Sequence, residues 1–310
     1  MTDPRVSLAG VEFAGPAFTA SGCAAAGKEL SGFFDLTEIG GVVTKSIMMR
    51  PRSGRPTPRM VETPSGMLNS IGLQGPGIES FLANDLPWLA ERDVSAVVSI
   101  AGESVEEYAQ LARILRNEPA VKAIAVNISC PNVESRGQVF ACDVMSASSV
   151  IHQVRRNSSS STPILAKLSP DVTSIAEIAV SCHNAGADGF SMINTTLGMA
   201  IDTDTLRPIL GGVTGGLSGP AIRPMALRCV WQVHQLLPDV PILGMGGIAT
   251  GADALQFLAA GASAVSVGTM TFHDPSAPVR VQRELLALLG ERGFATVGAA
   301  VGIAHRGGLG

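Results

Sequence analysis

Short apolar runs recur along the chain, and each is followed by a polar or glycine-rich turn and then by a segment with helical periodicity. Continuous runs of Val, Ile and Ala of this length are typical of parallel strands covered on both faces. Seven runs are clear, at residues 41–46, 94–102, 123–130, 163–169, 188–196, 241–248 and 262–269. The intervening segments predict amphipathic helices at 104–117, 146–157, 173–185, 221–237, 251–260 and 277–291. This alternation indicates an α/β protein with a parallel sheet.

An eighth strand is expected between residues 197 and 218, which would complete the count for a closed barrel. Eight strands that alternate with helices favour a (β/α)8 TIM barrel over a doubly wound open sheet. No linker, shift in composition or short repeat divides the chain, so residues 1–310 are predicted to form a single barrel domain. Insertions are expected at the carboxyl-terminal face, the main one at residues 47–92. Ser174, with Glu177 three residues later, predicts a capping box at the start of one helix.

The main insertion opens with a basic, proline-rich loop, MMRPRSGRPTPRM (48–60). It holds four arginines within residues 50–59, and these are expected to form a solvated loop. An acidic partner that binds the four arginines is the alternative.

The balance of residue types bounds the class of protein. Hydrophobic residues make up 46% of the chain and charged residues 15%, which suits a strand-rich globular protein better than a disordered one. The formal net charge of −4 gives no basic excess for binding nucleic acid or an anionic membrane surface. No segment has 18 uninterrupted apolar residues, and the amino terminus lacks the apolar core of a secretory signal. We therefore expect a soluble, cytoplasmic protein.

The cysteines and histidines are too scattered to suggest a metal site. The five cysteines are Cys23, Cys130, Cys142, Cys182 and Cys229. No two of them form the C-x-x-C pair that holds zinc or an iron–sulfur cluster, and their odd number argues against a disulfide framework. His152, His183 and His234 fall in predicted helices, where surface or packing roles are expected. We therefore predict no catalytic metal on this chain.

The stretch NISCPN (127–132) places two amides and a thiol at the end of an apolar run. Pro131 cannot extend a central ladder, so the strand should stop beside Cys130. Cys130 is then either a small core hydrophobe or a reactive group at a strand mouth. Lys167 presents a similar choice, because a lysine inside PILAKLS (163–169) either pairs with a buried anion or extends to solvent.

Other strand ends carry further polar groups and glycines, and barrel enzymes keep their reactive residues at such ends. The candidates are Lys45, Ser46, Ser99, Asn127, Cys130, Lys167, Asn194, Thr195, Gly246, Gly247, Gly268 and Thr269. Glycine-rich segments at 213–220, 244–251 and 266–269 predict a phosphate cup made of backbone N–H groups and a helix amino terminus. No P-loop is present, nor a Rossmann fingerprint with its downstream acid, which disfavours ATP and a Rossmann-bound dinucleotide.

Several motifs follow one another in order from about residue 5 to residue 290. They are VTKS (43–46), ETPSGMLNSIGLQGPG (62–77), NISCPN (127–132), KLSP (167–170), SMINTTLGMAID (191–202), VTGGLSGPAIRP (213–224), GMGGI (244–248) and VGT (267–269). This set resembles the dihydroorotate dehydrogenase family. The resemblance implies an FMN-binding barrel that oxidises (S)-dihydroorotate to orotate in de novo pyrimidine biosynthesis.

Carried over position by position, the resemblance implies roles for individual residues. Cys130 matches the catalytic base of the soluble class, and a thiol, with an ordinary pKa of about 8.5, can be tuned towards neutrality. Substrate-holding positions are matched by Lys45, Asn69, Ser70, Ile71, Gly72, Leu73, Asn127, Asn194 and Thr195. FMN-binding positions are matched by Ser21, Lys45, Ser46, Ser99, Asn127, Lys167, Ile193, Gly219, Gly246, Gly247, Gly268 and Thr269. The chain departs from the family pattern in TMTFHDPSAP (269–278).

The segments GMLNSIGLQGPG (66–77) and TGGLSGPAIRP (214–224) most resemble the subclass whose catalytic chain works with an electron-transfer subunit. The resemblance implies that this partner carries FAD and a 2Fe–2S cluster and passes electrons to NAD. It also implies a homodimer at the core of a heterotetramer. The lack of cluster-binding cysteine pairs in this chain agrees with that arrangement.

Other functions stay open as alternatives. The nearest is a homodimeric dihydroorotate dehydrogenase that uses fumarate and needs no partner subunit. A flavin-free, phosphate-binding barrel lyase or isomerase is a rival from another class. A non-catalytic scaffold is disfavoured, because it would have no need of Lys45, Cys130 and Lys167 at separate strand mouths. The electron acceptor, the oligomeric arrangement and the pKa of Cys130 are not fixed by the sequence.

Overall fold

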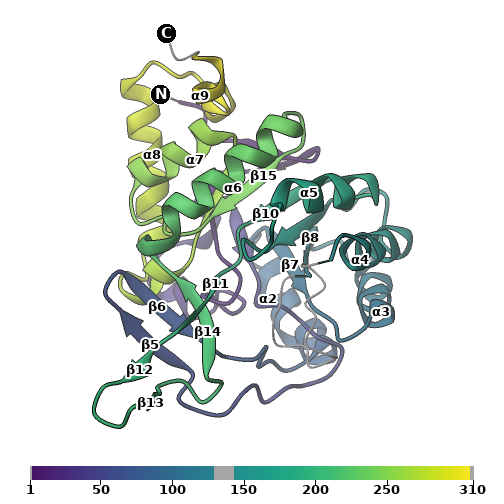
Figure 1. Cartoon of the computed structure of the whole chain (residues 1–310). Helices are drawn as coiled ribbons and strands as arrows, with labels where there is room; N and C mark the ends of the chain where they lie inside the picture. The colour runs from purple at the N-terminus through teal and green to yellow at the C-terminus, as the bar shows by residue number, and fades with distance from the viewer. Residues whose placement is uncertain (1, 129–142, 308–310) are drawn as a thin grey trace.

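The computed structural model describes residues 2–128 and 143–307 of the chain. Within them, parallel strands close into a barrel in the order β10-β15-β16-β3-β4-β7-β8-β9 (Figure 1). Their bounds are β3 Ala17–Thr19, β4 Gly41–Val43, β7 Ala96–Ile100, β8 Val121–Asn127, β9 Ile164–Leu168, β10 Gly189–Met192, β15 Ile242–Met245 and β16 Ala264–Val267. The predicted (β/α)8 barrel is confirmed, and each of the seven clear apolar runs overlaps one of these strands; β8 begins two residues before its run.

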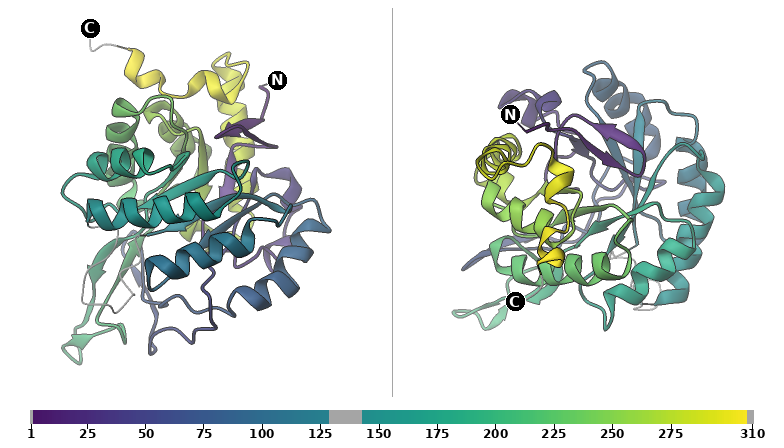
Figure 2. Two further views of the ribbon diagram at one scale, coloured as in Figure 1. Left: turned by 90° about the vertical axis from the view of Figure 1, so that its right-hand side faces the viewer. Right: turned by 90° about the horizontal axis from the view of Figure 1, so that it is seen from above.

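Six long helices surround the strands, as the view from above in Figure 2 shows. They are α3 Val105–Leu115, α4 Val144–Asn157, α5 Ile175–Asn184, α6 Arg223–Leu236, α7 Gly251–Ala260 and α8 Ala277–Glu291. Each end lies within two residues of the prediction, because the amphipathic period and the capping residues together define where a helix starts and stops. The shorter helices are η1 Leu30–Gly32, η2 Leu36–Glu38, α1 Ile78–Ser80, η3 Phe81–Asp85, α2 Leu86–Ala90, η5 Pro220–Ile222, η6 Thr269–Phe272, η7 Val297–Ala300 and α9 Ile303–Arg306.

Side-chain caps hold the starts of several helices. At α5, Ser174 Oγ accepts a hydrogen bond from the N–H of Glu177 at 3.3 Å, so the N-cap half of the predicted capping box is present. A reciprocal box occurs at α7, where the Thr250 side chain accepts from the N–H of Asp253 and the Asp253 side chain accepts from the N–H of Thr250. Such caps satisfy amides that the first turn of a helix leaves without partners.

The position predicted for the eighth strand is wrong. The barrel strand that was missed is β3, whose three residues, AFT, are too few and too weakly β-branched to stand out as an apolar run. Residues 197–218 instead contribute to β11 Thr196–Met199, β12 Ile201–Asp202, β13 Arg207–Pro208 and β14 Thr214–Ser218, which lie outside the barrel. Exposed and partly buried residues alternate along β11, as expected of an antiparallel strand with one face in solvent.

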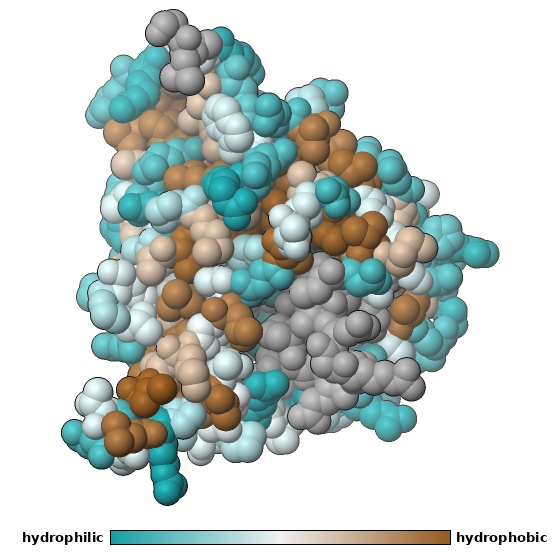
Figure 3. Space-filling view, in the orientation of Figure 1, coloured by the Kyte–Doolittle hydropathy of each residue, from teal (hydrophilic) through white to brown (hydrophobic). Residues whose placement is uncertain are grey.

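These strands belong to an arm at the carboxyl-terminal end of the barrel (lower left in Figure 1). The arm comprises the antiparallel sheet β11-β14-β6-β5, with β5 Met60–Thr63 and β6 Gly66–Asn69, and the hairpin β12–β13. Figure 3 shows a brown, apolar surface over this region. The exposed apolar residues of the arm are Met60, Leu197, Met199, Ile201, Leu206 and Val213. An apolar surface of this kind usually marks a binding interface.

The amino-terminal hairpin, β1 Val6–Leu8 and β2 Val11–Phe13, lies at the opposite end of the barrel from the arm (Figure 2). Leu8 is 1% exposed, and the ring of Phe13 meets Phe18 of β3 edge-on at a centroid distance of 5.1 Å. The hairpin therefore buries apolar surface against the first barrel strand.

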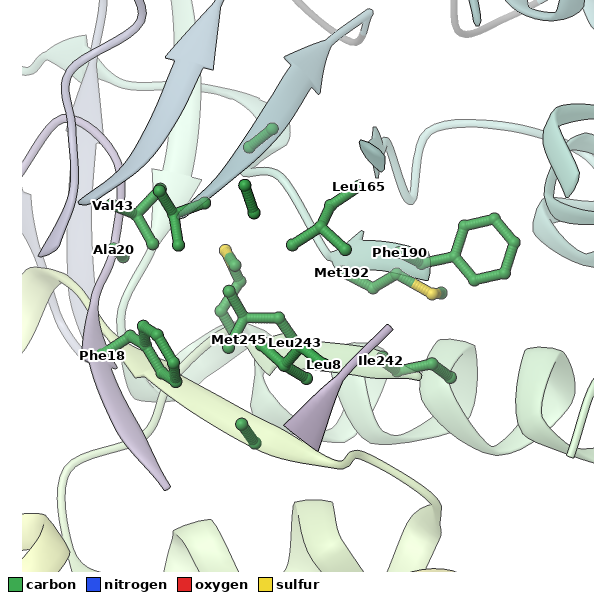
Figure 4. Close-up of a cluster of buried hydrophobic side chains, with 14 of the residues drawn as sticks. Leu8, Phe18, Ala20, Val43, Leu165, Phe190, Met192, Ile242, Leu243 and Met245 are labelled. Atoms are coloured by element: carbon green, nitrogen blue, oxygen red, sulfur yellow. The ribbon is translucent and has the colours of Figure 1, made fainter. Parts of the chain in front are cut away.

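The barrel interior changes character along the strands. Figure 4 shows Val43, Leu165, Leu243 and Met245 pointing into the enclosed space, whereas Phe190 points outward to the helical layer. Because successive side chains in a strand alternate between the two faces, inward positions recur every second residue. On β9 the inward residue after Leu165 is the polar Lys167, whereas on β15 the inward residue after Leu243 is still apolar, Met245. No helix in the described parts of the chain is long and apolar enough to span a membrane.

Candidate active site

A cavity of about 340 Å³ opens at the carboxyl ends of the barrel strands. Its walls come from the strand ends and from the arm, which contributes Met67, Asn69, Gly216 and Ser218. Pockets of a few hundred Å³ with a few convergent polar groups are typical ligand sites. Its place at this face of the barrel agrees with the usual location of active sites in the fold.

The cavity floor is the polar layer of the barrel interior. Asn127 pairs in register with Lys167 on β9, and Lys167 pairs with Ser191 on β10, so these three side chains project to the same side of the sheet. Asn127 and Lys167 are both 6% exposed. The alternation along each strand therefore brings an amide and an ammonium group to the floor from sequence positions 40 residues apart.

Asn127 lies at the centre of a hydrogen-bond network. Its Nδ2 donates to Ser46 Oγ at 3.0 Å, and its Oδ1 accepts from Asn194 Nδ2 at 3.3 Å. Ser46 Oγ in turn lies 2.9 Å from Ser99 Oγ. The backbone N–H of Ser99 donates to Thr44 Oγ1 at 3.1 Å. Four strand ends are joined in this way, which fixes the orientation of the amide in the pocket.

Two lysines give the pocket positive charge. Lys45 reaches the pocket from the end of β4, and a Cβ placed on Gly22 would lie 3.6 Å from its Nζ. Both Lys45 and Lys167 face Cys23, whose thiol also lines the pocket. Burial raises the pKa of Cys23 to about 11, although both ammonium groups oppose this shift. Cys23 is therefore a neutral thiol at pH 7, so it adds no negative charge to the pocket.

The glycine turn after β15 forms a second part of the pocket. Gly246 and Gly247 have φ values of +128° and +77°, which side chains with a Cβ rarely adopt. No hydrogen bond from the N–H of Gly247 or Ile248 to another described residue is found, so these donors are available to a ligand. On the adjoining strand end, Thr269 Oγ1 donates to Ser218 Oγ at 2.8 Å.

The predicted contribution of a helix amino terminus to this cup needs correction. The N–H groups of Ala249 and Thr250 both donate to Asp253 Oδ2 at 3.0 Å, and the N–H of Gly251 donates to Glu284 Oε2 at 2.7 Å. The first amides of α7 are thus already bonded. The segment 213–220 is likewise mostly strand β14, with positive φ values only at its two ends, Val213 and Gly219. The available donors lie in the glycine turn itself.

The basic loop at residues 48–60, the arginine loop, is bound to the segment 69–75 and is less solvated than expected. Arg52 Nε donates to Gly72 O at 3.0 Å, its backbone pairs with Gly75, and its guanidinium also forms an ion pair with Glu103. Arg59 donates to Gln74 Oε1 at 2.6 Å. Only part of this loop is free to meet an acidic partner, because these two side chains bind the chain's own residues.

Most residues expected at the site line this one cavity. They are Ser21, Lys45, Ser46, Asn69, Ile71, Gly72, Leu73, Asn127, Lys167, Ile193, Asn194, Thr195, Gly219, Gly246, Gly247, Gly268 and Thr269. Ser99 lies behind the wall and supports Ser46, and Ser70 is buried with its N–H donating to Arg59 O at 2.7 Å. Cys130 lies outside the described residues. The three histidines lie in α4, α5 and α6, as predicted, and none lines the cavity.

Several residues that line the cavity were not expected from the sequence, among them Cys23, Met245 and Ser266. Ser266 is 1% exposed, and its Oγ has no hydrogen-bond partner among the described residues. Its inward position two residues before Gly268 follows from strand alternation, so the period of the run 262–269 would have revealed it. Cys23 was missed because β3 was not recognised as a barrel strand.

The fold and the cavity define a barrel enzyme whose reactive groups lie at the strand ends. A model of the dihydroorotate dehydrogenase family matches residues 5–289. The "Dihydroorotate dehydrogenase B (NAD(+)), catalytic subunit" of Geotalea daltonii is 49% identical over 300 residues, which cover 97% of each chain. The proteins of the same name from Desulforudis audaxviator and Pelobacter propionicus are 47% and 49% identical, over 97% of this chain and 97% and 98% of their own. The chain belongs to the dihydroorotate dehydrogenase family.

Proposed function

We propose that this chain oxidises (S)-dihydroorotate to orotate with FMN as its cofactor, as the catalytic subunit of an NAD-linked enzyme of de novo pyrimidine biosynthesis. The observation that carries this proposal is the single cavity at the carboxyl face, which unites two lysines, a bridged pair of asparagines and a glycine turn. The near full-length similarity to named NAD-linked catalytic subunits supports the same reaction and acceptor.

The described residues fit FMN in three respects. Gly246 and Gly247, with available N–H donors beside them, suit a phosphate. The unpartnered hydroxyl of Ser266 suits a polar ligand atom deep in the pocket. Lys167 brings a buried positive charge, for which an electron-rich ring system is a favourable neighbour. Ser21, Lys45, Ser46, Asn127, Ile193, Gly219, Gly268 and Thr269 complete the proposed cofactor site, with Ser99 in support.

The substrate site is proposed on the arm side of the same cavity. Orotate carries a carboxylate and imide groups, which require several donors and acceptors held in fixed directions. Asn69, Asn127, Asn194 and Thr195 offer amide and hydroxyl groups there, with Ile71, Gly72 and Leu73 beside them. Lys45 would meet the negative charge of the carboxylate. Ser70 was also expected here, but it does not line the cavity, whereas its neighbours Asn69 and Ile71 do.

In the proposed reaction, a proton leaves one ring carbon and a hydride leaves the adjacent carbon. Cys130 is the proposed base that takes the proton, although it lies outside the described residues. FMN, when bound, supplies the hydride acceptor. Asn127 and Asn194, bonded to each other, would hold the substrate ring in one orientation while the proton is removed.

Electrons are proposed to leave through a partner subunit that carries FAD and a 2Fe–2S cluster and reduces NAD. The printed name of the relatives, catalytic subunit, supports a second chain in the assembly. We further propose that two copies of this chain form the core of the complex. The apolar surface of the arm supports a stable contact between copies.

The test uses the full chain loaded with FMN under anaerobic conditions. Dihydroorotate should bleach the flavin absorbance, whereas NAD alone should be a poor oxidant until the partner subunit is added. The absence of bleaching would refute the substrate assignment. Rapid turnover with fumarate and no partner would favour the homodimeric, fumarate-dependent enzyme, and a purified chain with no affinity for FMN would favour a flavin-free lyase or isomerase.

A further inference from the structure

Tyr108 reaches the candidate active site from behind its wall. It is the only tyrosine in the chain, it is 1% exposed, and it lies in the first turn of α3. Its hydroxyl donates to the backbone carbonyl oxygen of Asn127 at 2.8 Å. Since α3 starts just after the carboxyl end of β7, its first turn lies near the level at which the neighbouring strand β8 ends. Tyr108 is not among the residues that line the cavity.

The contact falls where β8 leaves the barrel ladder. The N–H of Ile128 turns back to Val126 O at 3.0 Å, so the regular pairing with β9 stops at Asn127. A strand end of this kind is less constrained than a residue within the ladder. A buried hydroxyl on its carbonyl therefore restrains the main chain at the point where restraint by the sheet ends.

The approach of Tyr108 depends on the loop before α3. A Cβ on Gly102 would lie 3.1 Å from Tyr108 Cδ2 and 3.2 Å from Tyr108 N. The glycine thus lets the tyrosine pack closely against the loop after β7. The ring and the loop together direct the hydroxyl at Asn127.

Asn127 is consequently held by three different elements. Its carbonyl accepts from Tyr108, its Nδ2 donates to Ser46 and its Oδ1 accepts from Asn194. The last two contacts orient the amide, while the first fixes the backbone that carries it. We propose that Tyr108 is a positioning residue for the reaction, which sets the location of the Asn127 amide in the pocket. This inference rests on the proposed function, in which Asn127 contacts substrate and cofactor.

The first test is Tyr108→Phe, which removes only the hydroxyl. Ser158→Ala is the matched control, because Ser158 is 5% exposed and its Oγ donates to Val154 O at 2.8 Å, at the end of α4 and away from the cavity. Both variants should lose some thermal stability and retain FMN. Tyr108→Phe alone should raise the Kd for orotate and the KM for dihydroorotate, and slow flavin reduction by about tenfold, the effect of a small displacement of a positioned group.

The second test uses the fact that Tyr108 is unique. Growth with 3-fluorotyrosine labels one site, and its single ¹⁹F resonance should move when orotate binds, because orotate engages the amide that this hydroxyl positions. A resonance that orotate leaves in place, or a Tyr108→Phe variant with parental orotate affinity and KM, would reduce Tyr108 to a packing role. If the parent enzyme fails to bind orotate, the proposed function itself fails, which the parent titration shows before any variant is compared.

Discussion

Burial decides what the individual polar groups of the pocket can do. Cys23 stays protonated because burial raises the pKa of its thiol to about 11, despite two nearby ammonium groups. Lys167 occupies an inward position on an otherwise apolar strand, where an unpaired charge would be costly. Burial therefore keeps Cys23 uncharged, while strand alternation brings the side chain of Lys167 to the pocket floor.

Removal of the proposed base should slow the chemistry and spare the binding of the cofactor. Cys130→Ala is expected to retain FMN but to slow its reduction by dihydroorotate by about 10²- to 10⁴-fold, the usual contribution of a general base. Cys130→Ser should recover partly as the pH rises. Stopped-flow absorbance of the flavin measures both rates. A parental rate in Cys130→Ala would leave Cys130 as a packing residue.

Lys167→Met should weaken the site for FMN, because it removes a buried cation from the pocket floor and keeps a similar side-chain length. We expect a higher Kd for FMN, or a more negative reduction potential, or both. Titration of the apoprotein and anaerobic potentiometry give the two values. If neither changes, the ammonium group does not act on the cofactor.

Contacts between elements hold the loops of the site and the terminal helix in place. The arginine loop binds the segment 69–75 through Arg52 and Arg59, so the insertion after β4 positions the proposed substrate-binding residues. At the other end of the barrel, α9 packs on α6 through the stacked rings of Trp231 and His305, 3.5 Å apart.

Arg52→Ala should loosen the segment 69–75 without emptying the pocket. The variant loses the hydrogen bond to Gly72 O and the ion pair with Glu103, and a charge-assisted bond contributes about 1.5–3 kcal/mol. We expect the KM for dihydroorotate to rise about 3- to 30-fold while FMN stays bound. Arg50→Ala, an exposed position in the same loop, is the control. Equal effects of the two changes would point to the net charge of the loop as the cause.

His234 should make stability depend on pH. Burial lowers its pKa below 6.5, and His305 and Arg306 lower it further, while Asp239 opposes them. The unfolded chain then binds a proton at His234 more readily than the folded chain does. The contribution of neutral His234 to the free energy of unfolding is therefore present above pH 6.5, and it is lost as the pH falls towards the pKa of His234 in the folded chain. Urea unfolding at pH 7.5 and 5.5 should show a smaller acid loss for His234→Asn than for the parent. His152→Asn, on an exposed part of α4, should behave like the parent, and an unchanged acid loss in His234→Asn would contradict the assignment.

In the molecule as a whole, the two ends of the barrel differ in what they carry. The amino-terminal hairpin covers one end and the arm lies at the other (Figures 1 and 2). The cavity is lined in part by residues of the arm. The arm exposes apolar side chains that no described residue covers. A twofold contact between two copies would use this same surface on both protomers and bury it on each.

Leu206→Asn tests this contact with little risk to folding. Leu206 is 79% exposed and has a φ of +55°, a conformation that asparagine adopts more readily than leucine. Thermal stability of the protomer should be kept or raised, while the dimer Kd should rise about tenfold through loss of apolar burial. Analytical ultracentrifugation measures the Kd. Met145→Gln, which changes an apolar residue 74% exposed on α4, should leave it unaltered; an unchanged Kd in Leu206→Asn would place the contact elsewhere.

Local order along the chain was enough to predict the alternation of strands and helices and most of the residues at the strand mouths. The seven apolar runs and six helices follow from periodicity and capping, which are properties of neighbouring residues. Lys45, Asn127, Lys167 and Gly246 could be placed at one face because parallel strands in a barrel end at the same side. The domain count and the role of Cys130 stay predictions.

Tertiary structure alone decided the features that depend on long-range pairing. β3 is too short to signal itself and becomes a strand because β16 and β4 supply its hydrogen-bond partners. Residues 197–218 leave the barrel because β14 pairs with β6, about 150 positions away in the sequence. The contact of Tyr108 with Asn127 and the unpartnered hydroxyl of Ser266 also arise only after the barrel closes. Periodicity reports which face of an element is buried, whereas the partner that buries it is chosen by the packing of the whole chain.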